Sequence, residues 1–153
     1  MQKTYLTKEQ ALQKLKHYCG YQERCHSEVI RKLYDLGVYK NEHDEILSTL
    51  IQENYLNEER FAIQFVGGKF RVKHWGKIKI KYELKSKQIS EYCIKKALAT
   101  ITTTDYLQTA QKLFDAKRNL LKSEKNIFIK KRKLQDYLMQ KGYEISVIKE
   151  LMD

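Results

Sequence analysis

Apolar residues recur every three or four positions along most of the chain, with polar residues between them. This is the spacing of an amphipathic helix that buries one face. The clearest runs are Leu12, Leu15 and Cys19; Val29, Leu33 and Leu36; Ile46, Leu47, Leu50 and Ile51; and Ile94, Ala97, Leu98 and Ile101. The 153 residues include no proline, the strongest helix breaker. We therefore expect an all-α protein.

Polar caps and glycines mark where these helices start and end. Thr7 and Gln10 form a capping box, and Asn57 stands directly before two glutamates, so we expect helices to start at both places. Further starts are predicted at Asn41 and Ser90, and ends at Gly20, Gly37 and Gly142.

Residues 69–82 fit two predictions. Basic and apolar residues alternate there almost perfectly, which is typical of a strand. Against a hairpin, Phe61, Phe65 and Val72 share one face at helical spacing, and no Asn-Gly or Asp-Gly pair supplies a tight turn. We therefore predict helices over this stretch.

Two adjacent glycines, Gly67 and Gly68, fall inside one of these predicted helices. Each glycine destabilises a helix by ~1 kcal/mol relative to alanine. The pair predicts a kink or a closely approaching neighbour, and a tolerated weak spot that serves no function is the alternative.

The helical pattern repeats three times. Leu33, Leu84 and Leu138 are followed four residues later by Gly37, Gln88 and Gly142, and then by a third helix that carries Ile46, Ile94 and Ile148. This register predicts three-helix repeats over 1–55, 56–102 and 103–153, with the uncharged stretch 100–104 as the clearest internal boundary. A unit this small cannot bury its apolar face alone, so we expect an elongated, curved array of stacked units.

Several short motifs resemble the bacterial RecX family, regulators of the RecA recombinase. The central one is YLNEERFA at residues 55–62, followed by Gly76, Ile80 and Glu83-Leu84; the upstream one is Arg24, Glu28-Val29, Lys32-Leu33 and Gly37. Cys25 stands where this family usually has a serine, and Gln88 where it usually has a glycine. The resemblance spans most of the chain and implies tandem three-helix units in a regulator that is not an enzyme.

The chain carries a formal charge of +11, which favours an anionic partner. One basic run comprises Lys69, Arg71, Lys73, Lys77, Lys79, Lys81, Lys85 and Lys87, and a second comprises Lys130, Lys131, Arg132 and Lys133. In a helix, Lys77, Lys81 and Lys85 form one stripe. Each run alone is as typical of a solvated helix face, but together, with Trp75 and Tyr82 available for stacking, they favour a partner- or DNA-binding site.

Other chemistry has little support in the sequence. No phosphate-binding loop, dinucleotide fingerprint or nucleophile elbow is present, so we expect no catalytic residues and no cofactor. His17, Cys19, Cys25 and His26 lie close together, but their spacing does not fit a zinc site, and we expect no metal. Three cysteines without a C-x-x-C pair, no signal peptide and no apolar span predict a soluble, cytoplasmic protein without membrane association.

The family resemblance implies binding to the RecA–DNA filament and modulation, expected to be inhibition, of filament extension, ATP hydrolysis and strand exchange. We expect single- and double-stranded DNA as further partners, and a monomer. The alternative is a stand-alone helical protein that contacts nucleic-acid phosphates without reading bases. An adaptor for another acidic protein would use the same charges.

Overall fold

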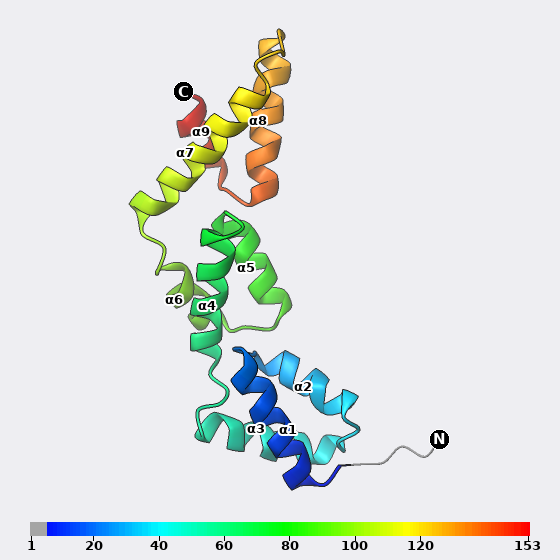
Figure 1. Cartoon of the computed structure of the whole chain (residues 1–153). Coiled ribbons are helices and arrows are strands. Elements are labelled where there is room, and N and C mark those ends of the chain that lie inside the picture. The colour runs from blue at the N-terminus through cyan, green and yellow to red at the C-terminus, as the bar shows by residue number, and fades with distance from the viewer. Residues whose placement is uncertain (1–5) are drawn as a thin grey trace, which may run out of the picture.

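The computed structural model describes residues 6–153, which form an elongated column of helices without a strand (Figure 1). The elements in chain order are α1 (Lys8–Tyr21), α2 (His26–Asp35), the short 3-10 helix η1 (Lys40–Glu42), α3 (His43–Gln52), α4 (Glu58–Arg71), α5 (Lys77–Ser86), α6 (Glu91–Leu98), α7 (Thr103–Leu120), α8 (Ile127–Lys141) and α9 (Ile145–Met152). The all-α prediction is confirmed.

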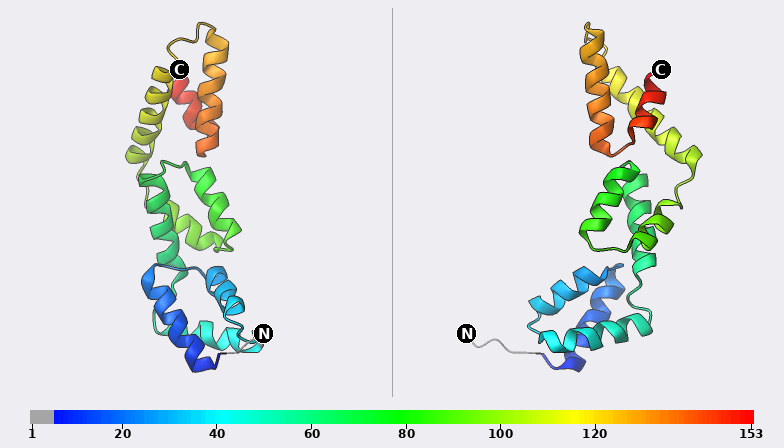
Figure 2. Two further views of the ribbon diagram at one scale, coloured as in Figure 1. Left: turned by 45° about the vertical axis from the view of Figure 1, so that its right-hand side comes forward. Right: turned by 180° about the vertical axis from the view of Figure 1, so that it is seen from behind.

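The helices group by threes into units that follow one another along the column. The first unit is α1–α3, the second α4–α6 and the third α7–α9, and two further views show the column as elongated and gently curved (Figure 2). The predicted array of tandem three-helix units is therefore confirmed.

Side-chain caps explain most of the helix starts. Thr7 and Gln10 form the predicted capping box, Asn57 Oδ1 accepts from Arg60 N at 2.9 Å, and Ser90 Oγ accepts from Cys93 N at 3.2 Å. At Cys25 the backbone N–H donates to Glu28 Oε1 at 3.0 Å, so the carboxylate half of that box survives without the hydroxyl.

Two of the predicted boundaries need correction. Gly20 does not end α1, which continues to Tyr21 before the chain turns extended at Gln22. Asn41 lies in the 3-10 helix, and α3 starts two residues later at His43 because the first turn closes as 3-10.

The contested stretch 69–82 forms the end of α4 and the first half of α5, so the hairpin alternative is wrong. Burial explains why the alternation misled: Ile80 is fully buried with Leu84 one turn further on, whereas Ile78 is 54% and Tyr82 is 72% exposed. Alternate apolar residues thus have opposite surroundings, and only the pair at helical spacing enters the core.

All three units have the same turn between their second and third helices. In each, a backbone N–H donates to the carbonyl five residues earlier: Val38 to Leu33, Ile89 to Leu84 and Tyr143 to Leu138, at 3.0, 3.1 and 3.1 Å. The residue before each donor has positive φ, +74° at Gly37, +63° at Gln88 and +99° at Gly142. Gln88 therefore adopts a left-handed conformation that favours glycine.

The two glycines inside α4 do not interrupt it. The helix is continuous from Glu58 to Arg71, and a Cβ on Gly67 would lie 2.5 Å from a guanidinium nitrogen of Arg71. Nothing lies within 4 Å of a Cβ on Gly68. The space at Gly67 is thus filled by the side chain of Arg71 on the same helix, not by a neighbouring element.

The buried residues form two separate cores. One belongs to the first unit and includes Leu15, Leu33 and Leu50. The other is shared by the second and third units and is joined from the first unit by Cys25. The second and third units therefore form one packed body, and the first unit packs around a core of its own beside it.

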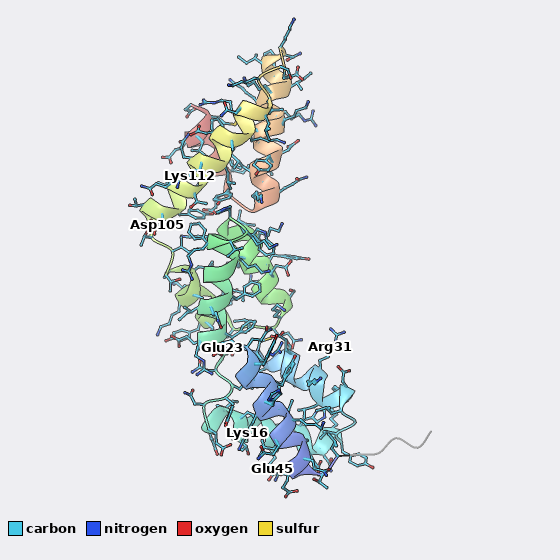
Figure 3. The ribbon with its side chains drawn as sticks, viewed as in Figure 1. Lys16, Glu23, Arg31, Glu45, Asp105 and Lys112 are labelled. Atoms are coloured by element: carbon cyan, nitrogen blue, oxygen red, sulfur yellow. The ribbon has the colours of Figure 1, made fainter. Side chains whose placement is uncertain are left out.

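The joint between the first and second units is mostly polar. Arg60 at the start of α4 pairs with Glu23, which lies at this junction (Figure 3), and it also donates to Asn54 Oδ1 and Asn54 O at 3.2 and 3.1 Å. Ser27 Oγ donates to Lys87 O at 2.9 Å. Within residues 6–153, no backbone-to-backbone hydrogen bond crosses this joint.

The joint between the second and third units is made by backbone and aromatic groups. Gly76 N donates to Lys141 O at 2.7 Å, and Ile78 N donates to Gly142 O at 3.0 Å. Tyr143 Oη donates to His74 O at 3.0 Å, and its ring stacks on that of Tyr106. This joint holds α5 in a fixed position against the third unit.

Candidate partner and nucleic-acid interface

The predicted stripe on α5 faces α6. Lys77 and Lys81, one turn apart, line a groove of about 490 Å³, and Lys85, one turn further on, pairs with Glu91 of α6 at 3.2 Å. The rest of the groove is formed by α6 and the residue after it: Glu91, Tyr92, Ile94, Lys95, Leu98 and Ala99. The helical spacing thus brings the three predicted lysines to one side of the second unit.

The one acidic side chain in this groove is held ionised. The hydrogen bond from Lys85, then the charges of Lys85 and Lys81, keep the pKa of Glu91 below its usual value. Lys77 Nζ lies 4.8 Å from the centre of the Tyr106 ring, and Glu91 is occupied by Lys85. The exposed ammonium groups of Lys81 and Lys95 therefore dominate the groove. A groove with this charge suits a phosphate or a carboxylate.

Lys69 and Lys79 lie elsewhere, around Trp75. Their Nζ atoms lie 4.9 Å and 4.5 Å from the centre of that ring, which is half-buried and packs against the shared core. These contacts are cation–π interactions within the protein. Trp75 therefore serves packing, whereas Tyr82 on α5 is 72% exposed.

Arg71 and Lys73, at the end of α4, make contacts that differ from each other. The guanidinium of Arg71 lies over Gly67 of its own helix. Lys73 is exposed, and its carbonyl accepts a hydrogen bond from Lys141 Nζ at 3.3 Å. Neither residue joins the α5–α6 groove.

The second basic run, with Lys130, Lys131 and Arg132, occupies the first turns of α8. A rise of 1.5 Å per residue places Lys130 about 16 Å along the helix from Lys141, which contacts the second unit. Lys133 pairs with Glu124 at 3.6 Å. The predicted site residues are therefore distributed over four places: the α5–α6 groove, the surroundings of Trp75, the end of α4 and the start of α8.

The sequence prediction missed Tyr92 and Lys95, which complete the groove from α6. The signal was present: Lys95 follows Glu91 by four residues, on the face of α6 opposite the buried residues Cys93 and Ala97. Residues on another helix can be assigned to the same site as a basic run only when the packing of the two helices is known.

The cysteines are not poised for chemistry. Cys19, Cys25 and Cys93 are buried free thiols, and burial raises the pKa of Cys19 to about 11. Among residues 6–153, no three His, Cys, Asp or Glu side chains gather in a way that could hold a metal ion. In the same range, no helix combines the length and apolar character needed to cross a membrane.

Comparison with known proteins gives matches along most of the chain. Models of the second and third three-helix domains of RecX match residues 57–98 and 104–152. Regulatory protein RecX of Chlorobium phaeobacteroides is 32% identical over 135 residues, which are 88% of this chain and 85% of that protein. Regulatory protein RecX of Clostridium perfringens is 34% identical over 114 residues, but these are only 53% of its length. The match thus spans about half of that longer relative.

Two crystal structures share the fold. RecX from Lactobacillus salivarius superimposes with a TM-score of 0.86 over 95% of this chain and 94% of that one, at 23% sequence identity. A second regulatory protein RecX superimposes with a TM-score of 0.85 over 100% of this chain and 82% of that one, also at 23% identity.

Proposed function

This chain belongs to the RecX family of regulatory proteins, and we propose that it binds the RecA–DNA filament and inhibits filament extension, ATP hydrolysis and strand exchange. The observation that carries the proposal is the match to the Chlorobium regulatory protein, which covers most of both chains. The role is regulatory rather than enzymatic.

The shape and charge of the molecule support this role. A column of three units with a formal charge of +11 can contact several subunits of a polymer and the DNA inside it. Several modest contacts made by one molecule add up to tight binding. A filament offers such repeated contacts, whereas a single small acidic protein does not.

Within this proposal, the α5–α6 groove contacts DNA phosphates or filament carboxylates. Lys81 and Lys95 supply the cations, whereas Lys77 Nζ lies over the Tyr106 ring at 4.8 Å. Tyr92 is 62% exposed, and Lys96 Nζ lies 5.1 Å from the centre of its ring, which adds a further cation beside the groove. Lys69 and Lys79 act indirectly, because their ammonium groups already contact Trp75. A regulator of a DNA-bound recombinase works where the DNA lies, so we place it in the cytoplasm, as a monomer.

A second function, sequence-independent nucleic-acid binding without RecA, is favoured by the same groove. Cations beside an exposed aromatic ring are a common arrangement for binding single strands. Both functions predict DNA binding, and they differ in whether the recombinase is recognised.

The experiment is a titration of the cognate RecA, at fixed concentration on single-stranded DNA, with this protein. A filament regulator is expected to suppress the DNA-dependent ATPase at far less than one molecule per RecA, because blocking a growing end needs few molecules. A protein that only coats DNA suppresses it when it covers the strand, and excess DNA then restores the rate. An unchanged rate at saturating protein contradicts the proposed function.

A further inference from the structure

The far end of the third unit carries an apolar surface that the proposed function does not use. We name it the apolar tip: Leu120 at the end of α7 and Ile127, Phe128 and Ile129 at the start of α8. Their side chains are exposed by 77%, 61%, 81% and 43%. The loop between these helices forms the upper end of the column, away from the first unit (Figure 1). Grouped exposed apolar residues in a small protein mark an interaction site.

The tip has a defined shape. Asn126 Oδ1 accepts from Phe128 N and Ile129 N at 3.0 and 3.3 Å, which fixes the first turn of α8. Asn126 N in turn donates to Glu124 Oε1 at 3.1 Å, and Glu124 N donates to Leu121 O at 3.0 Å. A surface ordered before binding loses little entropy on docking.

The charged residues around the apolar tip are almost all basic. Glu124 is the only acidic residue in 117–133, and Lys133 neutralises it at 3.6 Å. The cations of this segment are Lys117, Arg118, Lys122, Lys125, Lys130, Lys131, Arg132 and Lys133. The occupant must therefore offer an apolar surface bordered by carboxylates.

We propose that the apolar tip is a second docking surface, which inserts into an acid-rimmed apolar groove of a protein partner. Phe128, the most exposed of the four, is the central anchor, and the surrounding lysines pair with the rim. A second copy of this chain is a poor occupant, since it would bring the same cations. DNA phosphates would satisfy the lysines and leave the aliphatic side chains in water. The proposal rests on the proposed function in that the groove is sought on the RecA filament.

The first test uses anilinonaphthalene sulfonate, a dye that is both apolar and anionic, and so probes the tip without RecA. The double variant Phe128→Ser/Leu120→Ser is expected to bind it roughly tenfold more weakly than the parent, as loss of a central apolar anchor does. Tyr21→Ser is the matched control, because Tyr21 is 78% exposed and lies in the first unit. Equal dye binding by the tip variant and the parent overturns the proposal.

The second test measures binding to RecA filaments formed on single-stranded DNA. The tip variant is expected to bind with a dissociation constant roughly tenfold or more above that of the parent, and Tyr21→Ser is expected to match the parent. The charge variant Lys125→Glu/Lys131→Glu, which keeps all four apolar residues, is expected to weaken binding as well. Melting temperatures establish that all three variants fold.

The outcomes separate the two proposals. A parent that does not bind filaments removes the proposed function, and the tip proposal then stands or falls on the dye result. Filament binding by the tip variant equal to that of the parent overturns the tip proposal alone. The tip proposal is also overturned if the tip variant selectively loses binding to a bare oligonucleotide or to vesicles with anionic lipid. The apolar tip would then insert between DNA bases or contact a membrane.

Discussion

Gly76 and Gly142 lie where the second and third units meet, and neither has room for a Cβ. A Cβ on Gly76 would lie 2.3 Å from the carbonyl carbon and oxygen of Gly142, and one on Gly142 would lie 2.4 Å from Lys79 Cβ. Both clashes are with atoms close to the backbone, so no flexible side chain can move aside.

We predict that Gly76→Ala lowers the free energy of unfolding by about 1–3 kcal/mol through overpacking. The control is Gly68→Ala, which is expected to raise it by up to about 1 kcal/mol because this helix position has open space. Urea denaturation of both variants measures the difference. A Gly76→Ala protein as stable as the parent would mean that the units are not in backbone contact.

Gln88 is the exception among the three repeated turns. It has φ of +63° where the other two units have glycine. Gln88→Gly is expected to raise the free energy of unfolding by about 1 kcal/mol, since a side chain in the left-handed region costs roughly that much. Gly37→Ala places the same strain in the first unit and is expected to lower stability by a similar amount. If urea denaturation does not show that the two substitutions change the free energy of unfolding in opposite directions, this explanation is contradicted.

At this scale, the sequence predicted caps and turns well and contacts between distant side chains poorly. Thr7, Asn57 and Gln88 were identified because their effects act within a few residues. The position of Arg71 over Gly67 was not, because the pattern of glycines does not reveal which side chain fills the space beside them.

Among the elements, α5 and α7 are connected by Tyr106. Its Oη accepts from Lys77 N at 2.9 Å and donates to Glu144, so one hydroxyl joins the start of α5 to the residue that precedes α9. Burial, then the hydrogen bond to Glu144, raises the pKa of Tyr106 above its ordinary 10.0. Burial also raises the pKa of Tyr143, which stacks against it.

These shifts predict alkaline destabilisation. Above pH 10 the unfolded chain loses the two phenolic protons that the folded chain retains, so stability that is full below pH 10 is lost as pH rises. The free energy of unfolding should fall by up to about 1.4 kcal/mol per pH unit for each tyrosine. Tyr106→Phe should cost about 1–3 kcal/mol at pH 7, because the half-buried Lys77 N–H and Glu144 carboxylate lose their partner, and it should flatten the alkaline slope. Tyr82→Phe, at an exposed position, is the control and should leave the stability at pH 7 unchanged. An alkaline slope that is unchanged in Tyr106→Phe would contradict the assignment.

The direction that a helix face points could be predicted from the sequence where burial follows the helical periodicity. The stripe formed by Lys77, Lys81 and Lys85 follows from helical spacing alone, and it faces one side as expected. The contribution of α6 to the groove depends on how α5 packs against α6, which one-dimensional periodicity does not contain.

For the whole molecule, the question is whether binding depends on the groove or on net charge. Lys81→Glu/Lys95→Glu, at two exposed positions of the groove, is expected to weaken binding to single-stranded DNA and to make the dependence of log affinity on log salt shallower by ~0.7 per lost phosphate contact. The melting temperature should stay close to that of the parent, because exposed charges contribute little to stability.

Lys112→Glu/Lys149→Glu makes the same change of charge on α7 and α9 and serves as the control. Binding by this variant should remain much nearer to that of the parent. If both variants lose affinity equally, the long-range field of the protein drives binding, and the groove has no special role.

The two joints between units differ in kind, and this has a mechanical consequence. A column of units in series transmits a pulling force through every joint. The joint at Arg60 consists mainly of side-chain contacts, whereas the joint at Gly76 combines backbone hydrogen bonds with a continuous core. Under tension the first unit should therefore detach while the other two remain together. If both ends of the molecule are held on a polymer that changes length, the molecule would extend at the joint between the first and second units. The second and third units would move together as a rigid rod.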